Sequence, residues 1–219
     1  MKPRFSNQRN AAMTLVEVLV VITVLAVLAA MFLPGNNDTY RRASRINCVS
    51  NLKQIGLAYR LWEGDNNNKY PMFVSVTNGG AMELITTGNV AACFQVMSNE
   101  LSTPKILVCP ADVDHVAAAN FTTDFNNSRI SYFVGLDVTN EINPQMILCG
   151  DDNFEIGGVP VKSGLLELST NAPVSWTSAR HHFAGNIGLA DGSVQQVTTK
   201  GLQSAFQQAG LATNRLAIP

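Results

Sequence analysis

Four sets of residues in this sequence have types and spacings that could carry out chemistry. Glu17 is an acid near the start of a long apolar run, where a charge is costly. His181 is followed, after nine residues, by Asp191-Gly192. Residues 151–153 (Asp-Asp-Asn) offer a cluster of side-chain oxygens, and four cysteines are scattered along the chain: Cys48, Cys93, Cys109 and Cys149. Each set also has a purely structural explanation.

The acidic residues near 151 could bind calcium. Hard cations take six to eight oxygen ligands, and Asp151, Asp152 and Asp191 could supply some of them. The sequence contains no D-x-D-x-D-G loop, however, and Asp and Asn side chains in turns commonly bond their own backbone. We therefore expect a turn at 151–153 and no cofactor, with calcium at Asp151, Asp152 and Asp191 as the alternative.

The sequence carries no other motif for catalysis or metal binding. The histidines and cysteines lack the spacing of zinc ligands, and no C-x-x-C motif occurs. There is also no G-x-S-x-G motif and no glycine-rich phosphate loop. Asp151 and Asp152 are adjacent, so on a strand they would point to opposite faces rather than act as a pair. We predict that the chain is not an enzyme.

The segment that contains Asp191-Gly192 has the pattern of a β-hairpin. Residues 186–190 and 193–197 are two short strand-like runs, and Asp-Gly between such runs is a strong signal for a tight turn. Gly192 would supply the positive φ that this turn requires. We expect His181 to bond the backbone near the hairpin, with partner contact during assembly or a metal position as its functional alternatives.

The element that must position Glu17 is an apolar segment at residues 13–33. As a helix it would be about 32 Å long, enough to cross a bilayer core. A basic leader with Lys2, Arg4 and Arg9 precedes it. A secretory signal peptide would have a shorter apolar core, and a plain membrane anchor leaves the acid unexplained. A carboxylate in hydrocarbon costs about 2.5–3.5 kcal/mol and so needs a partner.

Residues 12–17, Ala-Met-Thr-Leu-Val-Glu, resemble the processing site of type IV prepilins and type II secretion pseudopilins. The resemblance implies that a prepilin peptidase cuts between Ala12 and Met13 and methylates the amine of Met13. Glu17 then becomes the fifth residue, whose carboxylate pairs with the terminal amine of a neighbouring subunit during assembly. Pro34 matches the helix-breaking proline of the family. The family more often has Gly before the cut and Phe after it.

A second helix is expected at residues 34–63, as an amphipathic continuation of the first. Five residues at spacings of four and three would form one apolar stripe that packs on a globular domain: Cys48, Leu52, Ile55, Tyr59 and Trp62. Beyond it, the pattern predicts strands at 72–77, 106–109, 129–134 and 145–149. Asn89 is expected to cap a helix that runs to about residue 101.

Several blocks resemble a subgroup of pseudopilin-like proteins of the planctomycete and verrucomicrobia type. The blocks are NLKQIGLA at 51–58, LVCPAD at 107–112, SYFVG at 131–135, GDDN at 150–153 and the signature His181-x9-Asp191-Gly192. The resemblance implies an α+β, pilin-like fold: a long N-terminal helix packed on a small, mostly antiparallel β domain. Cys48 and Cys109 recur in the subgroup's blocks, so this pair is the first candidate disulfide among the three full pairings of four cysteines.

Composition excludes a general nucleic-acid binder. Charged residues make up 14% of the chain and the net charge is −1. Without the leader and its three basic residues, twelve Lys and Arg side chains would face 16 acids, for a net charge of about −4. Such a chain lacks the basic stripe that polyanion binding requires.

We therefore predict a structural subunit of a type II secretion or type IV pilus-like filament. Its parts would be a leader (1–12), a transmembrane and assembly helix (13–33), an amphipathic helix (34–63) and a periplasmic α+β domain (64–219). The expected partners are prepilin peptidase, copies of the chain, other pseudopilins, the assembly platform with its ATPase, and the inner membrane, which the chain crosses once with its N-terminus in the cytoplasm. The alternative is a membrane-anchored periplasmic binding protein or metal-dependent enzyme that uses the region of His181 and Asp191.

Overall fold

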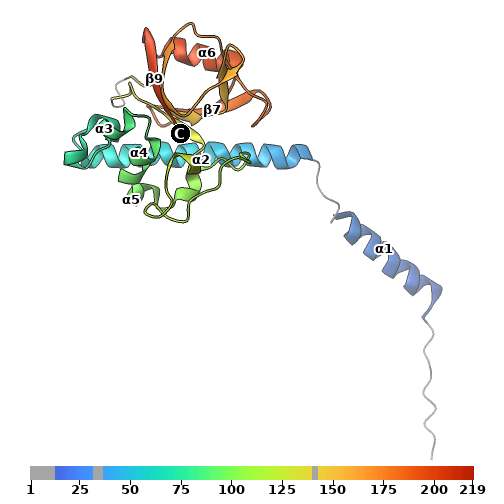
Figure 1. Ribbon diagram of the computed structural model, residues 1–219. Coiled ribbons are helices and arrows are strands. Elements are labelled where there is room, and N and C mark those ends of the chain that lie inside the picture. The colour runs from blue at the N-terminus through green and yellow to red at the C-terminus, as the bar shows by residue number, and fades with distance from the viewer. Residues whose placement is uncertain (1–12, 32–36, 140–142) are drawn as a thin grey trace, which may run out of the picture. The chain divides into compact units, whose positions relative to one another are not determined.

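The computed structural model describes residues 13–31, 37–139 and 143–219 (Figure 1). It divides into two compact units, residues 1–40 and 41–219. The predicted leader and the predicted helix break at Pro34 lie outside the described residues, as does Ala12 at the predicted cleavage site.

The first unit contains helix α1 (Leu15–Met31), which begins with a capping box. The Thr14 hydroxyl accepts a hydrogen bond from the backbone N–H of Glu17 at 3.3 Å, and the Glu17 carboxylate accepts one from the backbone N–H of Thr14 at 2.8 Å. This exchange satisfies backbone donors that the first turn leaves unpaired. All side chains from residue 13 to residue 30 are exposed. In the described ranges, none of the helices combines the length and hydropathy that a membrane crossing requires.

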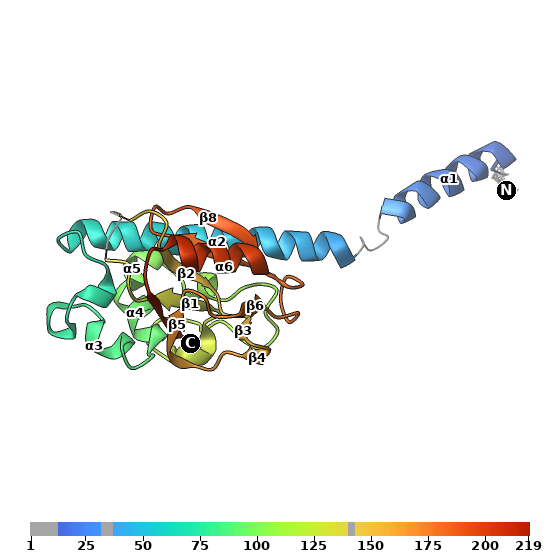
Figure 2. The ribbon, with the colours of Figure 1, turned by 90° about the horizontal axis from the view of Figure 1, so that it is seen from above.

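The second unit is built around helix α2 (Asn37–Asp65). The predicted apolar stripe is confirmed, because its five residues are at most 5% exposed: Cys48, Leu52, Ile55, Tyr59 and Trp62. Around the C-terminal part of α2 lie short helices (Figures 1 and 2): α3 (Met82–Ile85), α4 (Val90–Val96) and α5 (Ser98–Leu101). Asn89 caps α4 by accepting a hydrogen bond from the N–H of Ala92, as predicted.

Two predicted strands are helical instead. Residues 72–77 include parts of the 3₁₀ helices η1 (Pro71–Phe73) and η2 (Val76–Asn78). Residues 106 and 107 are the last two of η3 (Pro104–Leu107), and residues 108 and 109 follow it. Proline has a fixed φ and no N–H, which suits the first position of a helical turn better than a sheet ladder. A further 3₁₀ turn, η4 (Asn127–Arg129), shortens the strand predicted at 129–134.

The remaining chain forms two antiparallel sheets. The larger has the strand order β5-β9-β1-β2-β7-β8 and the smaller β4-β3-β6. The strands are β1 (Tyr132–Gly135), β2 (Ile147–Asp151), β3 (Phe154–Ile156), β4 (Val159–Pro160), β5 (Gly164–Ser169), β6 (Val174–Trp176), β7 (Ala184–Leu189), β8 (Val194–Thr198) and β9 (Thr213–Ile218). Helix α6 (Thr199–Gln208) follows β8. A long helix followed by antiparallel sheet is the α+β, pilin-like arrangement that the sequence predicts.

The central strands β1, β2 and β7 of the larger sheet are buried throughout, and the unit has a core on each face of these strands. On strand β1, Tyr132 and Val134 pack in the cluster around α2, whereas Phe133 packs in a second cluster with Trp176 and with Phe206 of α6. Alternate residues of a strand point to opposite faces, so one strand serves both cores. Close approach explains Gly185, because a Cβ there would lie 2.5 Å from the Trp176 ring.

The predicted hairpin is confirmed, and its turn packs on α2. Strands β7 and β8 pair with Ala184 opposite Thr198, and Gly192 in the turn has φ +80°. The backbone oxygen of Asp191 accepts a hydrogen bond from Arg60 of α2 at 3.2 Å. A Cβ on Gly56 would lie 3.7 Å from the Cα of Gly192, so the helix and the turn are in close contact.

Replacing Gly192 by Ala should destabilise the second unit by about 1–2 kcal/mol, because an L side chain at this positive φ is strained. Denaturant unfolding of the full chain measures the change. The control is Gly64→Ala in α2, where a Cβ meets no atom within 4 Å and a small gain from helix propensity is expected. Equal stability of the two variants would contradict the requirement for glycine in the turn.

Candidate functional site

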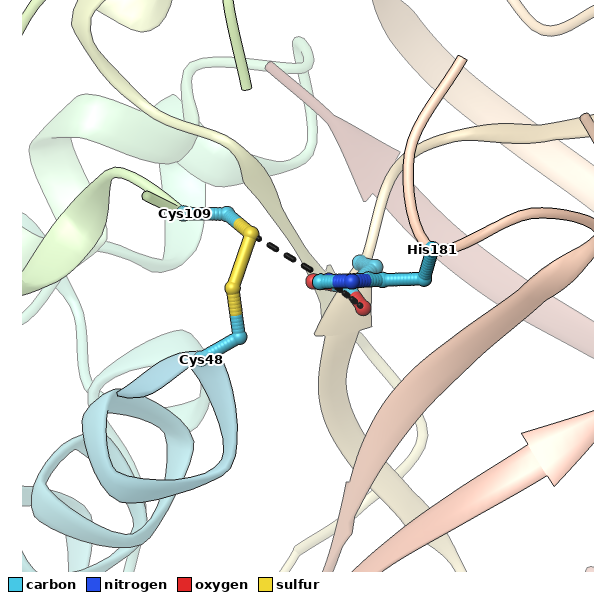
Figure 3. Close-up of side chains that lie close together, drawn as sticks. Cys48, Cys109 and His181 are labelled. Carbon is cyan, nitrogen blue, oxygen red and sulfur yellow. Dashed lines mark hydrogen bonds and ion pairs between the residues drawn. A yellow bond between two sulfur atoms is a disulfide. The ribbon is translucent and has the colours of Figure 1, made fainter. Parts of the chain in front are cut away.

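The sequence blocks that are far apart in the chain meet at a disulfide between Cys48 of α2 and Cys109, just after η3 (Figure 3). The two residues are 61 positions apart, their Cα atoms are separated by 5.2 Å, and both are buried. The bond ties the block LVCPAD to the helix that carries NLKQIGLA. It is the pair that the resemblance favours. Cys93 and Cys149 are free and buried, and burial raises the pKa of each thiol to about 12.

His181 lies against this disulfide, on the loop between β6 and β7. Its Nε2 atom is 3.3 Å from Sγ of Cys109 and 3.7 Å from Oδ2 of Asp151, and its side chain is 1% exposed (Figure 3). Burial, with Arg45 and Arg180 nearby, lowers the pKa of His181 to about 4, so its ring is neutral at pH 7. The ring bonds sulfur and faces a carboxylate, whereas a backbone partner was predicted.

The backbone holds His181 in a conformation that is rare for its residue type. His181, His182 and Phe183 have φ values of +49°, +50° and +55° in succession. Each non-glycine residue in this region costs about 1–2 kcal/mol. Such strain persists only where surrounding contacts fix the conformation. Here the loop is fixed on both sides, by the contact of His181 with Cys109 and by a hydrogen bond between His182 and Arg41 of α2.

Asp151, at the end of β2, is a fully buried carboxylate with incomplete hydrogen bonding. Its Oδ2 atom accepts bonds from the backbone N–H and the side-chain amide of Asn186, both at 2.8 Å. Its Oδ1 atom has no hydrogen-bond partner. Burial raises the pKa of Asp151 to about 7, although the bonds from Asn186 and the charge of Arg180 act in the opposite direction.

Arg180 is the centre of a buried ionic cluster beside His181. Its guanidinium pairs with Asp112 at 2.6 Å and with Asp152 at 2.5 Å, and donates to the backbone oxygen of Ser131 at 3.1 Å. Asp112 also accepts hydrogen bonds from the Ser131 hydroxyl and from His115. Burial alone would raise the pKa of Asp112, but Arg180 and these hydrogen bonds together hold it below its usual range. Burial raises the pKa of Asp152 to about 6 despite Arg180.

The structure separates the roles of the predicted site residues. His181 contacts the Cys48–Cys109 disulfide, whereas Asp191 caps its own turn by accepting a hydrogen bond from the N–H of Ser193 at 2.8 Å. The three calcium candidates, Asp151, Asp152 and Asp191, likewise have separate partners. Asp152 pairs with Arg180, and Asp151 bonds Asn186. Among the described residues, the group of ligand atoms close enough for one metal ion contains Asp151 but neither Asp152 nor Asp191.

Arg180, Asp112 and Asn186 also belong to the site, although their patterns in the sequence did not predict it. Arg180 directly precedes His181, and Asp112 ends the block LVCPAD, so both stood beside residues already singled out. Their shared signal is that charged residues are scarce in this chain, at 14%, and yet Asp112 falls inside a block and Arg180 directly before one. Asn186 gives no such signal, because only the pairing of β2 with β7 brings it to Asp151.

The arrangement does not fit a catalytic relay. In such a relay the two ring nitrogens of a histidine face different groups, one the nucleophile and the other the carboxylate. Here the same nitrogen, Nε2 of His181, faces both Cys109 and Asp151. The sulfur of Cys109 is also bonded to Cys48 rather than free to attack a substrate.

Replacing Arg180 by Met should destabilise the chain by about 3–5 kcal/mol, because it leaves the carboxylates of Asp112 and Asp152 buried without the arginine that pairs with both. The measurement is the free energy of unfolding in denaturant. Arg215→Met is the matched control: it breaks an arginine–aspartate pair with Asp137 in which the arginine side chain is 46% exposed, and should cost at most about 1 kcal/mol. A loss at Arg180 no larger than at Arg215 would contradict the structural importance of the cluster.

Comparisons with known proteins concern the N-terminal motif and part of the chain. Residues 7–33 match the family described as the prokaryotic N-terminal methylation motif. The chain is also 33% identical over 85 residues to the type II secretion system core protein G of Pectobacterium carotovorum subsp. carotovorum. The aligned part is 39% of this chain and 51% of that relative, so the match spans about half the length of the relative. No solved structure matches.

The matched motif contains Met13 and Glu17, and a long helix followed by antiparallel sheet is the fold expected of a processed prepilin. These findings show that the chain carries a prokaryotic N-terminal methylation motif and is similar, over part of its length, to a type II secretion core protein.

Proposed function

We propose that the chain is a structural subunit of a type II secretion or type IV pilus-like filament. In this proposal prepilin peptidase cuts between Ala12 and Met13 and methylates the new terminal amine. The processed helix then polymerises with copies of the chain and with other pseudopilins. The methylation motif at residues 7–33 and the similarity to a type II secretion core protein support the proposal.

The exposed apolar surface of α1 carries this proposal. The side chains of its residues 15–30 are exposed on every side, including large ones such as Leu15 at 79% and Leu25 at 58%. Apolar surface of this extent is unfavourable in water and marks a surface that a partner or a membrane covers. A filament whose core is made of such helices, or a bilayer before assembly, would cover it.

The proposed position in the cell follows from charge and redox chemistry. Lys2, Arg4 and Arg9 would keep the leader in the cytoplasm, while residues 13–33 hold the precursor in the inner membrane. The domain beyond them would then lie in the periplasm, where a disulfide such as Cys48–Cys109 persists. The assembly ATPase and platform protein would act on this membrane form.

Within the filament we propose that Glu17 pairs with the terminal amine of a neighbouring copy and so sets the axial register. In the structure its carboxylate accepts bonds from the backbone N–H of Thr14 at 2.8 Å and from the Thr14 hydroxyl at 3.0 Å. Glu17 therefore has a local role that any test of assembly must separate from the proposed intermolecular role. Since glutamine can replace glutamate in a capping box, the charge and the cap can be removed independently.

The alternative, a binding protein or metal-dependent enzyme that uses the region of His181 and Asp191, lacks a site that contains both residues, because the group of possible metal ligands around His181 does not include Asp191. The side chain of Asp191 accepts a hydrogen bond from Ser193 in its own turn, and its backbone oxygen accepts one from Arg60. His181 faces a disulfide.

Replacing Glu17 by Gln should reduce filament incorporation by on the order of tenfold, which is what the loss of about 1.4 kcal/mol of ionic pairing would produce. The helix cap should survive, because the amide oxygen of the introduced glutamine can still accept a hydrogen bond from Thr14. The amount of the variant in sheared filaments, relative to the amount in the membrane fraction, measures incorporation.

Thr14→Ala provides the matched control. It removes the capping hydroxyl, at a cost of about 1 kcal/mol to the helix, but keeps the charge of Glu17. We expect it to incorporate nearly as well as the parent chain. Incorporation that is normal in Glu17→Gln and impaired in Thr14→Ala would contradict the intermolecular role of the charge and leave Glu17 only its capping role.

A further inference from the structure

Four side chains that bind soft or borderline metals converge at the disulfide. The ligand atoms of Cys48, Cys109, Asp151 and His181 all lie within 4.8 Å of one another. They come from four separate segments: α2, the loop after η3, the end of β2 and the loop before β7. Figure 3 shows Cys48 and Cys109 reaching the disulfide from one side and His181 on the other side, with its ring pointing at the sulfurs.

The distances from the His181 ring nitrogen to one sulfur and to the carboxylate are those of ligands around one zinc ion, whereas the two sulfurs are bonded to each other. With Zn–S bonds of about 2.3 Å and Zn–N or Zn–O bonds of about 2.0–2.2 Å, a tetrahedral site has ligand-to-ligand edges of roughly 3.3–3.8 Å. Nε2 of His181 lies 3.3 Å from the Cys109 sulfur and 3.7 Å from Oδ2 of Asp151. One nitrogen that faces both a sulfur and a carboxylate is the arrangement that a shared cation requires.

A second feature of this group independently favours cation binding. Asp151 is fully buried, and its Oδ1 atom has no hydrogen-bond partner. A buried carboxylate that is only half satisfied is costly, and a bound cation would offset that cost. The consecutive positive φ values at residues 181–183 are a further cost, in the segment whose His181 ring contacts the Cys109 sulfur.

We propose that, when the disulfide is reduced, Cys48, Cys109, Asp151 and His181 bind one Zn²⁺. In the disulfide form the sulfurs are not thiolates, so the zinc form and the disulfide form exclude each other. A dithiol reductant converts one into the other: its thiolate attacks one sulfur, the S–S bond breaks, and its second thiol resolves the mixed disulfide. Two electrons pass to the cysteine pair, and the reductant becomes a disulfide.

Zinc binding then completes the change. The two cysteine thiols release two protons to solvent as their thiolates bind the ion, and His181 binds as the neutral ring. Two sulfurs, one nitrogen and one oxygen suit zinc rather than calcium, which takes only oxygen ligands. The zinc form would link the same two segments as the disulfide and would add β2 and the His181 loop. This inference concerns the globular unit and does not depend on filament assembly.

The test uses the full chain in detergent, first as the disulfide and then after reduction by a phosphine, which takes up the oxygen of water as the two thiols form. Thiol alkylation and mass spectrometry count the free cysteines. Native mass spectrometry with added Zn²⁺ then counts bound ions, and Co²⁺ in place of zinc reports thiolate ligands through its charge-transfer absorption. We expect one ion per reduced chain, none per oxidised chain, and a thiolate–cobalt band in the reduced chain alone.

Variants locate the site. His181→Ala and Asp151→Asn should each weaken zinc binding at least about tenfold, the lower end of what loss of even an outer-shell partner costs. The matched control, Asp124→Asn, changes an exposed acid outside this group of ligands and should bind as the parent does. The proposal is overturned if the reduced parent chain, with its thiols counted as free, binds no zinc. It is equally overturned if binding is unchanged in both His181→Ala and Asp151→Asn, because the ion would then lie elsewhere.

Discussion

The globular unit depends on one junction, in which Arg180 is held between Asp112 and Asp152 beside the disulfide that His181 contacts. These side chains come from the loop after η3, the end of β2 and the loop before β7, and the disulfide adds α2. Charges buried in this way are tolerated only when every partner is present. The junction therefore fixes how the sheet and the long helix meet, and removing any one segment would leave the others with unpaired buried groups.

The junction also explains why the resembling blocks occur as separated pieces. NLKQIGLA follows Cys48 on α2, LVCPAD supplies Cys109 and Asp112, SYFVG supplies Ser131, and GDDN supplies Asp151 and Asp152. The signature supplies His181 at one end of β7 and, at the other end, the Asp191-Gly192 turn that packs on Gly56 and Arg60. Strand β7 thus joins a contact with the Cys48–Cys109 disulfide at one end to a contact with α2 at the other, which gives the spacing between histidine and Asp-Gly a structural reason.

The first unit presents the opposite situation. The globular unit buries its apolar side chains in two cores, whereas the described side chains of α1 are all exposed. The capping box of Thr14 and Glu17 provides hydrogen-bond partners for backbone N–H groups at the start of the helix, but it does not cover the apolar surface of the helix. A domain with buried cores and an N-terminal helix with an uncovered apolar surface are what the proposed polymerisation through that helix requires.

The features that were predicted correctly are those that residues close together in the sequence determine. The stripe on α2, the Asn89 cap and the Asp-Gly hairpin follow from spacing and turn chemistry, and the structure confirms them. The strands expected near Pro71 and Pro104 were wrong because proline starts 3₁₀ turns there, which outweighs the β-type composition around them.

The partners of His181 and Asp151 could not be predicted, since they are set by contacts between distant segments. Sequence spacing suggested a backbone partner for the histidine and a turn for the acids. Only the pairing of β2 with β7 and the closure of the disulfide bring these groups together. The cysteine pair itself came from the resemblance, because four scattered cysteines allow three full pairings.

The central claim is that the chain becomes a filament subunit through processing at its N-terminal motif. Mass spectrometry of the mature N-terminus, on protein isolated from cells with an active prepilin peptidase, tests it most directly. The account predicts a chain that begins at N-methylated Met13. A chain that begins near Ala30, or one that keeps Met1, would contradict it.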